Sequence, residues 1–213
     1  GLKAKVVSPT SLNQVWGAYA TVSDAFGYVY QDGGHEFYVL TFPTANTTWA
    51  FDASTKEWAE RPMTISSTFP ARHRASCYAF FNRMHIVGDY SNGKVYELSA
   101  TTYTDDSDAI TRQRIFPHAY SEKDRIRLKE FELDCETGVG ASNITISWSK
   151  DGGHTYSATT FDRSLGAASA YKTRLVVRSL GIARDWLFKI SMTGAVKAVI
   201  RDAIARPRNE QTK

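Results

Sequence analysis

The stretch SWSKDGGHTYS, residues 147–157, joins two strand-like segments and holds the most regular motif of the chain. Its glycines permit a backbone with positive φ, and Asp151 can accept hydrogen bonds from backbone N–H groups of its own turn. Tyr156 can then pack its ring beneath the hairpin. The spacing S-x-D-x-G-x-T-Y is formed by Ser149, Asp151, Gly153, Thr155 and Tyr156. The sequence therefore predicts a structural turn between two strands.

This spacing is the Asp-box of sialidases and other β-propellers, which leaves a glycosidase as an alternative. In sialidases the boxes lie on the outer rim of the propeller, away from the active site. A sialidase also needs an arginine cluster for the substrate carboxylate and a Tyr/Glu nucleophile pair, which a single box cannot indicate. A second Asp-Gly-Gly-His stretch, at residues 32–35, precedes another strand-like segment. We therefore expect the motif to be structural.

Short alternating strands surround the motif and predict a small antiparallel β-sandwich over residues 116–205. Ile126 and Leu128 share one phase of alternation, whereas Phe131, Leu133 and Cys135 take the other. A strand changes phase only where a residue is inserted, so we expect a β-bulge near Lys129-Glu130. Residues 206–213 are predicted to form a flexible tail. The six expected strands are residues 126–135, 144–148, 155–161, 173–177, 186–192 and 196–200.

Residues 1–115 contain two copies of one strand pattern and predict a partial, kelch-like β-propeller of about two blades. The motif Trp49-Ala50-Phe51 recurs as Tyr96-Glu97-Leu98, 47 residues later. A four-stranded propeller blade spans about 40–50 residues. Since a closed propeller needs about four to eight blades, we expect the other blades to come from sequence outside this chain. The whole chain is therefore predicted to be all-β.

Charge is unevenly distributed along the chain. From Tyr171 to Lys213 there are ten Lys/Arg against three acidic residues, a formal charge of +7, whereas the whole chain carries +4. A basic end can contact nucleic acid or an acidic partner, and it can equally be a solvated surface. Arg174, Arg178 and Arg201 are the candidate contacts with DNA or a partner.

The two cysteines, Cys77 and Cys135, lie in apolar strand-like segments, and we expect both to be reduced core residues. The sequence shows neither a secretory signal nor an apolar run of membrane-spanning length. We therefore expect the protein to have no membrane partner.

Catalytic and metal-binding motifs are missing from the sequence. It has no nucleophile elbow, phosphate-binding loop or zinc-protease motif, and Gly138-Val139-Gly140 lacks the third glycine of a dinucleotide site. The spacing of His73, Cys77 and His85 is not that of a zinc site, and Thr104–Asp108 lacks the glycine and distal glutamate of a calcium loop. We predict no enzymatic activity, no cofactor and no metal.

Five stretches carry a resemblance to a known family, and they occur in the family's order: HEFYVLTFP (35–43), TWAFDASTKEWAERP (48–62), HIVGDYSNGKVYEL (85–98), FELDCETGVG (131–140) and WSKDGGHTYS (148–157). The chain resembles the packaged-DNA stabilisation proteins of short-tailed phages, also called head-completion or tail-hub proteins. Members are about twice as long, so the resemblance covers their C-terminal portion.

The resemblance implies a structural virion protein, located in the tail and assembled in the host cytoplasm. It implies a hexameric ring below the portal that closes the DNA exit channel. The implied partners are further copies of the chain, portal and adaptor ring subunits, a tail needle, and tail fibre or spike proteins, with packaged DNA as a non-specific contact. Two alternatives remain: a sialidase-like or carbohydrate-binding β-propeller, and a kelch-like protein-interaction module.

Overall fold

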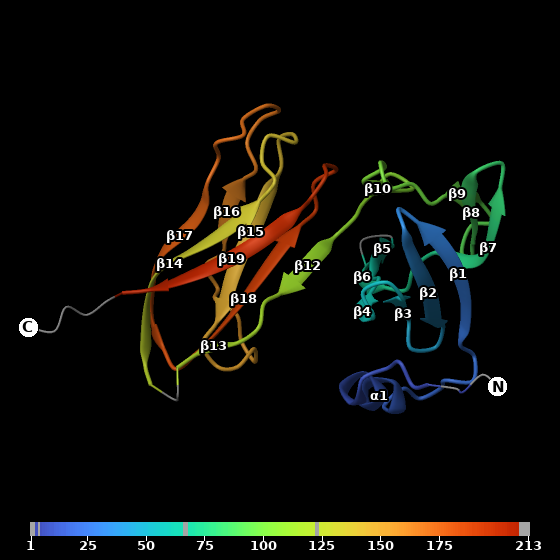
Figure 1. The fold of residues 1–213 in the computed structure, drawn as a ribbon, viewed down its shortest axis with the longest axis horizontal. Coiled ribbons are helices and arrows are strands. Elements are labelled where there is room, and N and C mark those ends of the chain that lie inside the picture. The colour runs from blue at the N-terminus through green and yellow to red at the C-terminus, as the bar shows by residue number, and fades with distance from the viewer. Residues whose placement is uncertain (1–2, 4, 66–67, 122–123, 209–213) are drawn as a thin grey trace, which may run out of the picture. The chain divides into compact units, whose positions relative to one another are not determined.

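The computed structural model describes residues 3, 5–65, 68–121 and 124–208. The chain divides into two compact units, Gly1–Ala100 and Thr101–Lys213, and its described regular secondary structure is β-strand apart from one short helix (Figure 1). The predicted boundary at residue 115 lies further along the chain, but β12 (Arg112–Ile115) already pairs with a strand of the second unit. In the described part of the chain, no helix combines the length and apolar character that crossing a membrane requires.

The two larger antiparallel sheets of the first unit correspond to the repeat found in the sequence. The first sheet is a four-stranded meander of β1 (Phe26–Asp32), β2 (His35–Phe42), β3 (Thr47–Asp52) and β4 (Glu57–Glu60). The second sheet has three strands, β7 (Ala75–Phe81), β8 (Met84–Asp89) and β9 (Val95–Glu97). In each sheet the repeated aromatic motif lies on the third strand, because Trp49 pairs with Leu40 and Tyr96 pairs with Val87.

Two short hairpins follow these sheets along the chain. The hairpin of β5 (Met63–Ile65) and β6 (Thr68–Ala71) connects the two sheets in sequence. Where a fourth strand of the second sheet is expected by the 47-residue spacing, the chain instead forms a separate hairpin of β10 (Thr104–Asp105) and β11 (Asp108–Ala109). The second propeller-type sheet therefore has three strands among the described residues.

Aromatic rings hold the first unit together. Tyr28 stacks on Tyr78 of the second sheet with ring centroids 5.4 Å apart, and Tyr30 contacts Tyr78 and Phe37. Burial raises the pKa of Tyr28 to about 12. The opposite face of the first sheet is covered by α1 (Thr10–Gly17), a helix the sequence analysis missed.

Trp16 of this helix packs against three aromatic side chains of the first sheet, Phe42, Trp49 and Trp58.

Cys77 is exposed, so its prediction as a core residue is wrong. Alternate residues of β7 face opposite sides of the sheet, and Tyr78 takes the side that packs on the first sheet. Cys77 therefore lies on the other side, which is also where Val95 of β9 lies, since both residues neighbour Gly88 of β8 across the sheet. Phe81 and Val95 are 69% and 68% exposed on this outer side. Cys135 is a buried free thiol, as predicted.

The second unit is a β-sandwich of two sheets, whose strands cross one another in the view of Figure 1. One sheet has the order β12-β18-β15-β16, with β13 also paired to β18; the other has the order β17-β14-β19. Their strands are β13 (Ala119–Tyr120), β14 (Ile126–Cys135), β15 (Asn143–Ser149), β16 (Phe161–Ser164), β17 (Leu175–Ala183), β18 (Asp185–Met192) and β19 (Ile200–Pro207).

The sandwich core lies between the two sheets and is built from alternate residues of the long strands. Trp186 and Phe188 of β18 pack with Phe131 of β14, whose ring centroid is 4.0 Å from that of Phe188. Trp186, Ile146 and Val177 are fully buried. The predicted β-bulge is confirmed, because the pairing of β14 with both neighbours shifts register between Leu128 and Glu130.

Two strand predictions in the sandwich are wrong. The strand expected at 155–161 begins only at Phe161, because the Asp-box turn still holds Ser157, whose N–H donates to the carbonyl of Trp148. The strand expected at 196–200 instead begins at Ile200 and runs to Pro207. Arg206 and Pro207 therefore belong to β19 and not to the predicted tail, of which residues 209–213 lie outside the described residues.

Candidate functional site

The Asp-box is one closed turn after β15, and it brings all five of its predicted residues together. The Ser149 hydroxyl is 2.6 Å from Asp151 Oδ1 and accepts a hydrogen bond from the N–H of Gly153. Both carboxylate oxygens of Asp151 are used, because the Thr155 N–H donates to Oδ1 and the Thr155 hydroxyl donates to Oδ2. Gly152 and Gly153 have φ of +74° and +96°, which few other residues adopt.

These hydrogen bonds stabilise the charged form of the Asp151 carboxyl. The bond from Ser149, followed by those from Thr155, holds its pKa far below the usual range. Tyr156 closes the turn with its ring beneath the ammonium of Lys189, whose Nζ is 4.1 Å from the ring centroid. The arrangement satisfies its own polar groups, and the structural role of the turn remains a prediction to be tested.

His73 and His85, whose spacing was compared with that of a zinc site, each lie among other side chains of the first unit. Burial, with the nearby Arg61 and Arg74, lowers the pKa of His73 to about 4. His85 Nδ1 lies 2.9 Å from the Tyr78 hydroxyl. Among the described residues, no group of three or more His, Cys, Asp or Glu is placed to hold a metal.

The Thr104–Asp108 stretch is the tight turn of the β10–β11 hairpin, with Asp106 and Ser107 at positive φ.

Past the bulge, β14 carries a row of acidic side chains on the outer face of the sandwich. Phe131, Leu133 and Cys135 point into the core. Because side chains alternate along a strand, the residues between them point outward. These are Glu130, Glu132 and Asp134, followed by Glu136 just beyond the end of the strand.

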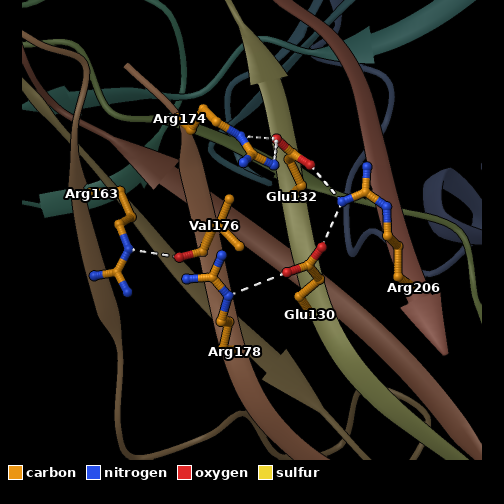
Figure 2. Close-up of polar contacts among 7 residues, drawn as sticks. All are labelled: Glu130, Glu132, Arg163, Arg174, Val176, Arg178 and Arg206. Atoms are coloured by element: carbon orange, nitrogen blue, oxygen red, sulfur yellow. Dashed lines mark hydrogen bonds and ion pairs between the residues drawn. The ribbon is translucent and has the colours of Figure 1, made fainter. Parts of the chain in front are cut away.

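Basic side chains from the flanking segments pair with this acidic row (Figure 2). The Arg206 Nη1 atom bridges Glu130 and Glu132 at 2.6 and 2.7 Å. From the β17 side, Arg178 lies 3.3 Å from Glu130 and Arg174 lies 2.8 Å from Glu132. Arg206 contributes most to lowering the pKa of Glu130, and Arg174 contributes most to lowering that of Glu132. We call this row and its cations the charge ladder.

Two further pairs extend the charge ladder, Arg201 with Asp134 at 3.6 Å and Lys197 with Glu136 at 2.9 Å. Arg174, Arg178 and Arg201, the three candidates for DNA contact, are therefore each paired with a carboxylate. The structure distributes them along the ladder, and their contact with DNA stays a prediction. The acidic residues alternate visibly in the sequence, but their partners lie 42–76 residues away and only the strand register reveals them.

On the other side of the bulge, the outer face of β14 is basic. An open cleft of ≈ 1020 Å³ lies there and is lined by Arg127, Lys129, Arg178 and Arg208, with Ile182 and Pro207 among its other residues. A second hollow shares Arg127, Ile182, Pro207 and Arg208 and adds Arg125 and Asp124. We call these two hollows together the basic cleft. The sequence did not predict Arg127, Lys129 or Arg208 as contacts with DNA or a partner.

The outer edge of β17 carries a side-chain contact in place of a strand. Arg163 of β16 donates a hydrogen bond from Nε to the backbone carbonyl of Val176, at 3.0 Å (Figure 2). Among the described strands, β17 pairs only with β14. Arg163 therefore covers a carbonyl on the open edge of the three-stranded sheet.

Comparison with protein-family models gives two matches that follow one another along the chain. Residues 1–103 match the model described as bacteriophage P22 Gp10, beta-propeller, and residues 111–207 match the model described as bacteriophage P22 Gp10, beta-sandwich. A search of curated proteins finds no match. Because the two matches together cover nearly the whole chain, it belongs to the P22 Gp10 family of phage structural proteins.

Proposed function

We propose that this member of the P22 Gp10 family is a subunit of a tail hub, a hexameric ring that closes the DNA exit channel below the portal and anchors tail appendages. The observation that supports the proposal is the order of the two family matches, propeller then sandwich, along one chain. The fold agrees with that order, since propeller-type sheets precede a two-layered sandwich.

A ring subunit needs surfaces for several neighbours, and both units offer such surfaces. The outer side of the second propeller-type sheet exposes Phe81 and Val95, apolar side chains of the kind that protein contacts cover. The sandwich offers a charged outer face with both signs of charge. We propose as partners further copies of the chain, portal and adaptor subunits, a tail needle, and tail fibre or spike proteins, in virions assembled in the host cytoplasm.

The alternative of a sialidase-like or carbohydrate-binding propeller is not favoured. Both Asp151 carboxylate oxygens accept hydrogen bonds from Thr155, and Oδ1 also accepts one from Ser149, so the turn itself accounts for the carboxylate without a sugar ligand. A kelch-like protein-interaction module explains the propeller sheets but not the match of the sandwich to a phage family. We therefore propose a structural protein without catalytic activity.

A phage lacking this gene provides the decisive test. We expect its capsids to fill with DNA and then to lose it, and to lack tail appendages, because the exit channel stays open. Supplying the wild-type gene in trans should restore stable, tailed particles, in which electron microscopy shows six copies around the portal axis. Particles that keep their DNA and tails without the protein would overturn the proposal.

The absence of catalysis has its own test. Sialic acid conjugates, chitin and peptidoglycan fragments should remain intact after long incubation with the pure protein. Turnover that disappears in Asp151→Asn or Tyr156→Phe, but persists in the matched variant Asp162→Asn outside the Asp-box, would restore the glycosidase alternative.

A further inference from the structure

We infer that the basic cleft binds the phosphate backbone of double-stranded DNA, without reading its sequence. The choice of packaged DNA as the natural occupant rests on the proposed function. The preference for a phosphate backbone rests on the residues of the cleft itself. The inference about the cleft and the proposed function can therefore fail separately.

The first step is the charge of the cleft. Arg125, Arg127, Lys129 and Arg208 are exposed, and none of them forms an ion pair with a carboxylate in the part of the chain that the structure describes. Asp124 lines one of the two hollows, so the cleft retains a clear positive excess. The charge ladder differs in this respect, since each of its carboxylates has a basic partner. The cleft is thus the place on this face where cations outnumber the acids of the described chain.

The second step is the backbone that creates the cleft. Leu128 pairs with Gly181 and Glu130 pairs with Arg178, so the single residue Lys129 stands opposite two residues of β17. Ser179 and Gly181 adopt φ of +62° and +93° to accommodate the extra residue. A bulge bends the strand and redirects its side chains. Against β19, Leu128 pairs with Pro207 and Glu130 pairs with Arg206, so Lys129 is an extra residue of β14 there. This insertion reverses which residues of β14 face outward, so that Arg127 and Lys129 take the place of the acidic row.

The third step concerns the chemistry of the occupant. The lining residues include no aromatic side chain on which a base could stack. They include four guanidinium groups, which bind phosphate with two parallel hydrogen bonds. Groups of this kind contact the DNA backbone and carry no sequence information.

An acidic peptide suits the cleft less well. A peptide strand gains affinity by pairing with a free sheet edge. The cleft is instead lined by residues of β14 and β17 and by the end of β19, where the backbone of the central strand is already paired on both sides. Arg178 marks the limit of the site, because it also belongs to the charge ladder through Glu130.

The test uses the whole chain and duplex DNA of two unrelated sequences, with binding followed by fluorescence anisotropy across a salt series. The cleft variant carries Arg127→Gln, Lys129→Gln and Arg208→Gln, all at exposed positions. The matched control loses the same charge elsewhere, through Lys5→Gln, Lys56→Gln and Lys172→Gln, which are also exposed. Circular dichroism and Tm confirm that both variants stay folded.

We expect weak binding of both sequences with equal affinity, and a steep loss with salt. In the cleft variant the slope of log K against log salt should fall by about 2–3, because each lost phosphate contact releases about 0.9 fewer counterions. The control should keep the wild-type slope. Equal losses in both variants, or no binding of DNA at low salt, would overturn the inference.

Poly-L-glutamate distinguishes the other class of occupant. If it binds the wild type more tightly than DNA does and loses this affinity only in the cleft variant, the site is for an acidic protein partner and the inference is wrong. Because these measurements need no ring or virion, they can fail while the phage deletion still shows the expected loss of DNA. Conversely, the cleft can bind DNA in these measurements while the phage deletion shows no loss of DNA, and then only the proposed function fails.

Discussion

The two units of the chain bury apolar surface in different ways. The sandwich encloses a continuous cluster of fifteen buried residues between its own two sheets, whereas the propeller unit has a buried cluster of three, Tyr30, Val39 and Ala50, among the described residues. The propeller sheets rely on aromatic stacks and leave Phe81 and Val95 exposed. The comparison teaches that the sandwich is held by one continuous core between its sheets, whereas the propeller sheets are held by a small core and by contacts between aromatic rings.

The largest expected effect comes from opening the sandwich core. Phe131 is 2% exposed and stacks on Phe188. Phe131→Ala should lower the free energy of unfolding by about 3–5 kcal/mol, since the cavity adds to the lost burial. Hydrogen exchange followed by mass spectrometry should show the loss of protection in the second unit only. Equal loss in the first unit would mean that the two units unfold as one.

A smaller effect is expected from the aromatic stacks of the propeller unit. Tyr78→Ala removes ring contacts with Tyr28 and Tyr30 and should cost about 1–2 kcal/mol. Its matched control, Phe81→Ala, removes an exposed ring three residues further along β7 and should change stability by less than about 0.5 kcal/mol. Thermal unfolding of the isolated chain compares them. A large effect of Phe81→Ala would show that its side is already covered.

The third prediction concerns the Asp-box. Asp151→Ala leaves the N–H and hydroxyl of Thr155 without their acceptor, so Tm of the sandwich should fall by several degrees. His154→Ala, at an exposed position of the same turn, should leave Tm almost unchanged. Any partner or sugar binding, measured per folded molecule, should be equal in both variants. An unchanged Tm together with lost sugar binding would contradict the structural role.

The smallest effect is expected from the charge ladder and appears as a dependence on pH. Arg174 and Arg206 hold the pKa of Glu132 below its usual 4.5. A carboxyl with a lowered pKa stabilises the fold above its unfolded pKa, and this contribution is lost as pH falls through the folded pKa. Tm of the wild type should therefore drop more steeply below about pH 4.5 than Tm of Glu132→Gln. Glu97→Gln, an exposed control, should follow the wild type, and parallel curves for all three proteins would argue against the ladder.

The sequence predicted the sandwich strands best where a long alternation was uninterrupted. The change of phase between Leu128 and Phe131 predicted the bulge, because a residue inserted in β14 keeps both side chains in the core, and the pairing of β14 with β19 contains that insertion. The helix Thr10–Gly17 was missed because it is short and has no side-chain cap. The helix is held in place by Trp16, which packs on aromatic rings far away in the sequence. The local sequence does not show that contact.

The functional surfaces were less predictable than the strands. The Asp-box lies within one short stretch, so its spacing alone brought its residues together. Arg178 and Glu130 are 48 residues apart, and Arg206 and Glu130 are 76 residues apart. Composition showed an excess of basic residues near the C-terminus. It could not show that β14 neutralises part of that excess on one side of the bulge and adds Arg127 and Lys129 to it on the other.

The guanidinium of Arg163 has a consequence for solubility. A strand edge with unpaired carbonyls can recruit a strand from another molecule, and proteins prevent this with charged side chains. Arg163 occupies the carbonyl of Val176 and places a positive charge on the edge of β17. At this edge Arg163 therefore opposes the addition of a strand from another copy when newly made copies meet at high concentration before their final assembly.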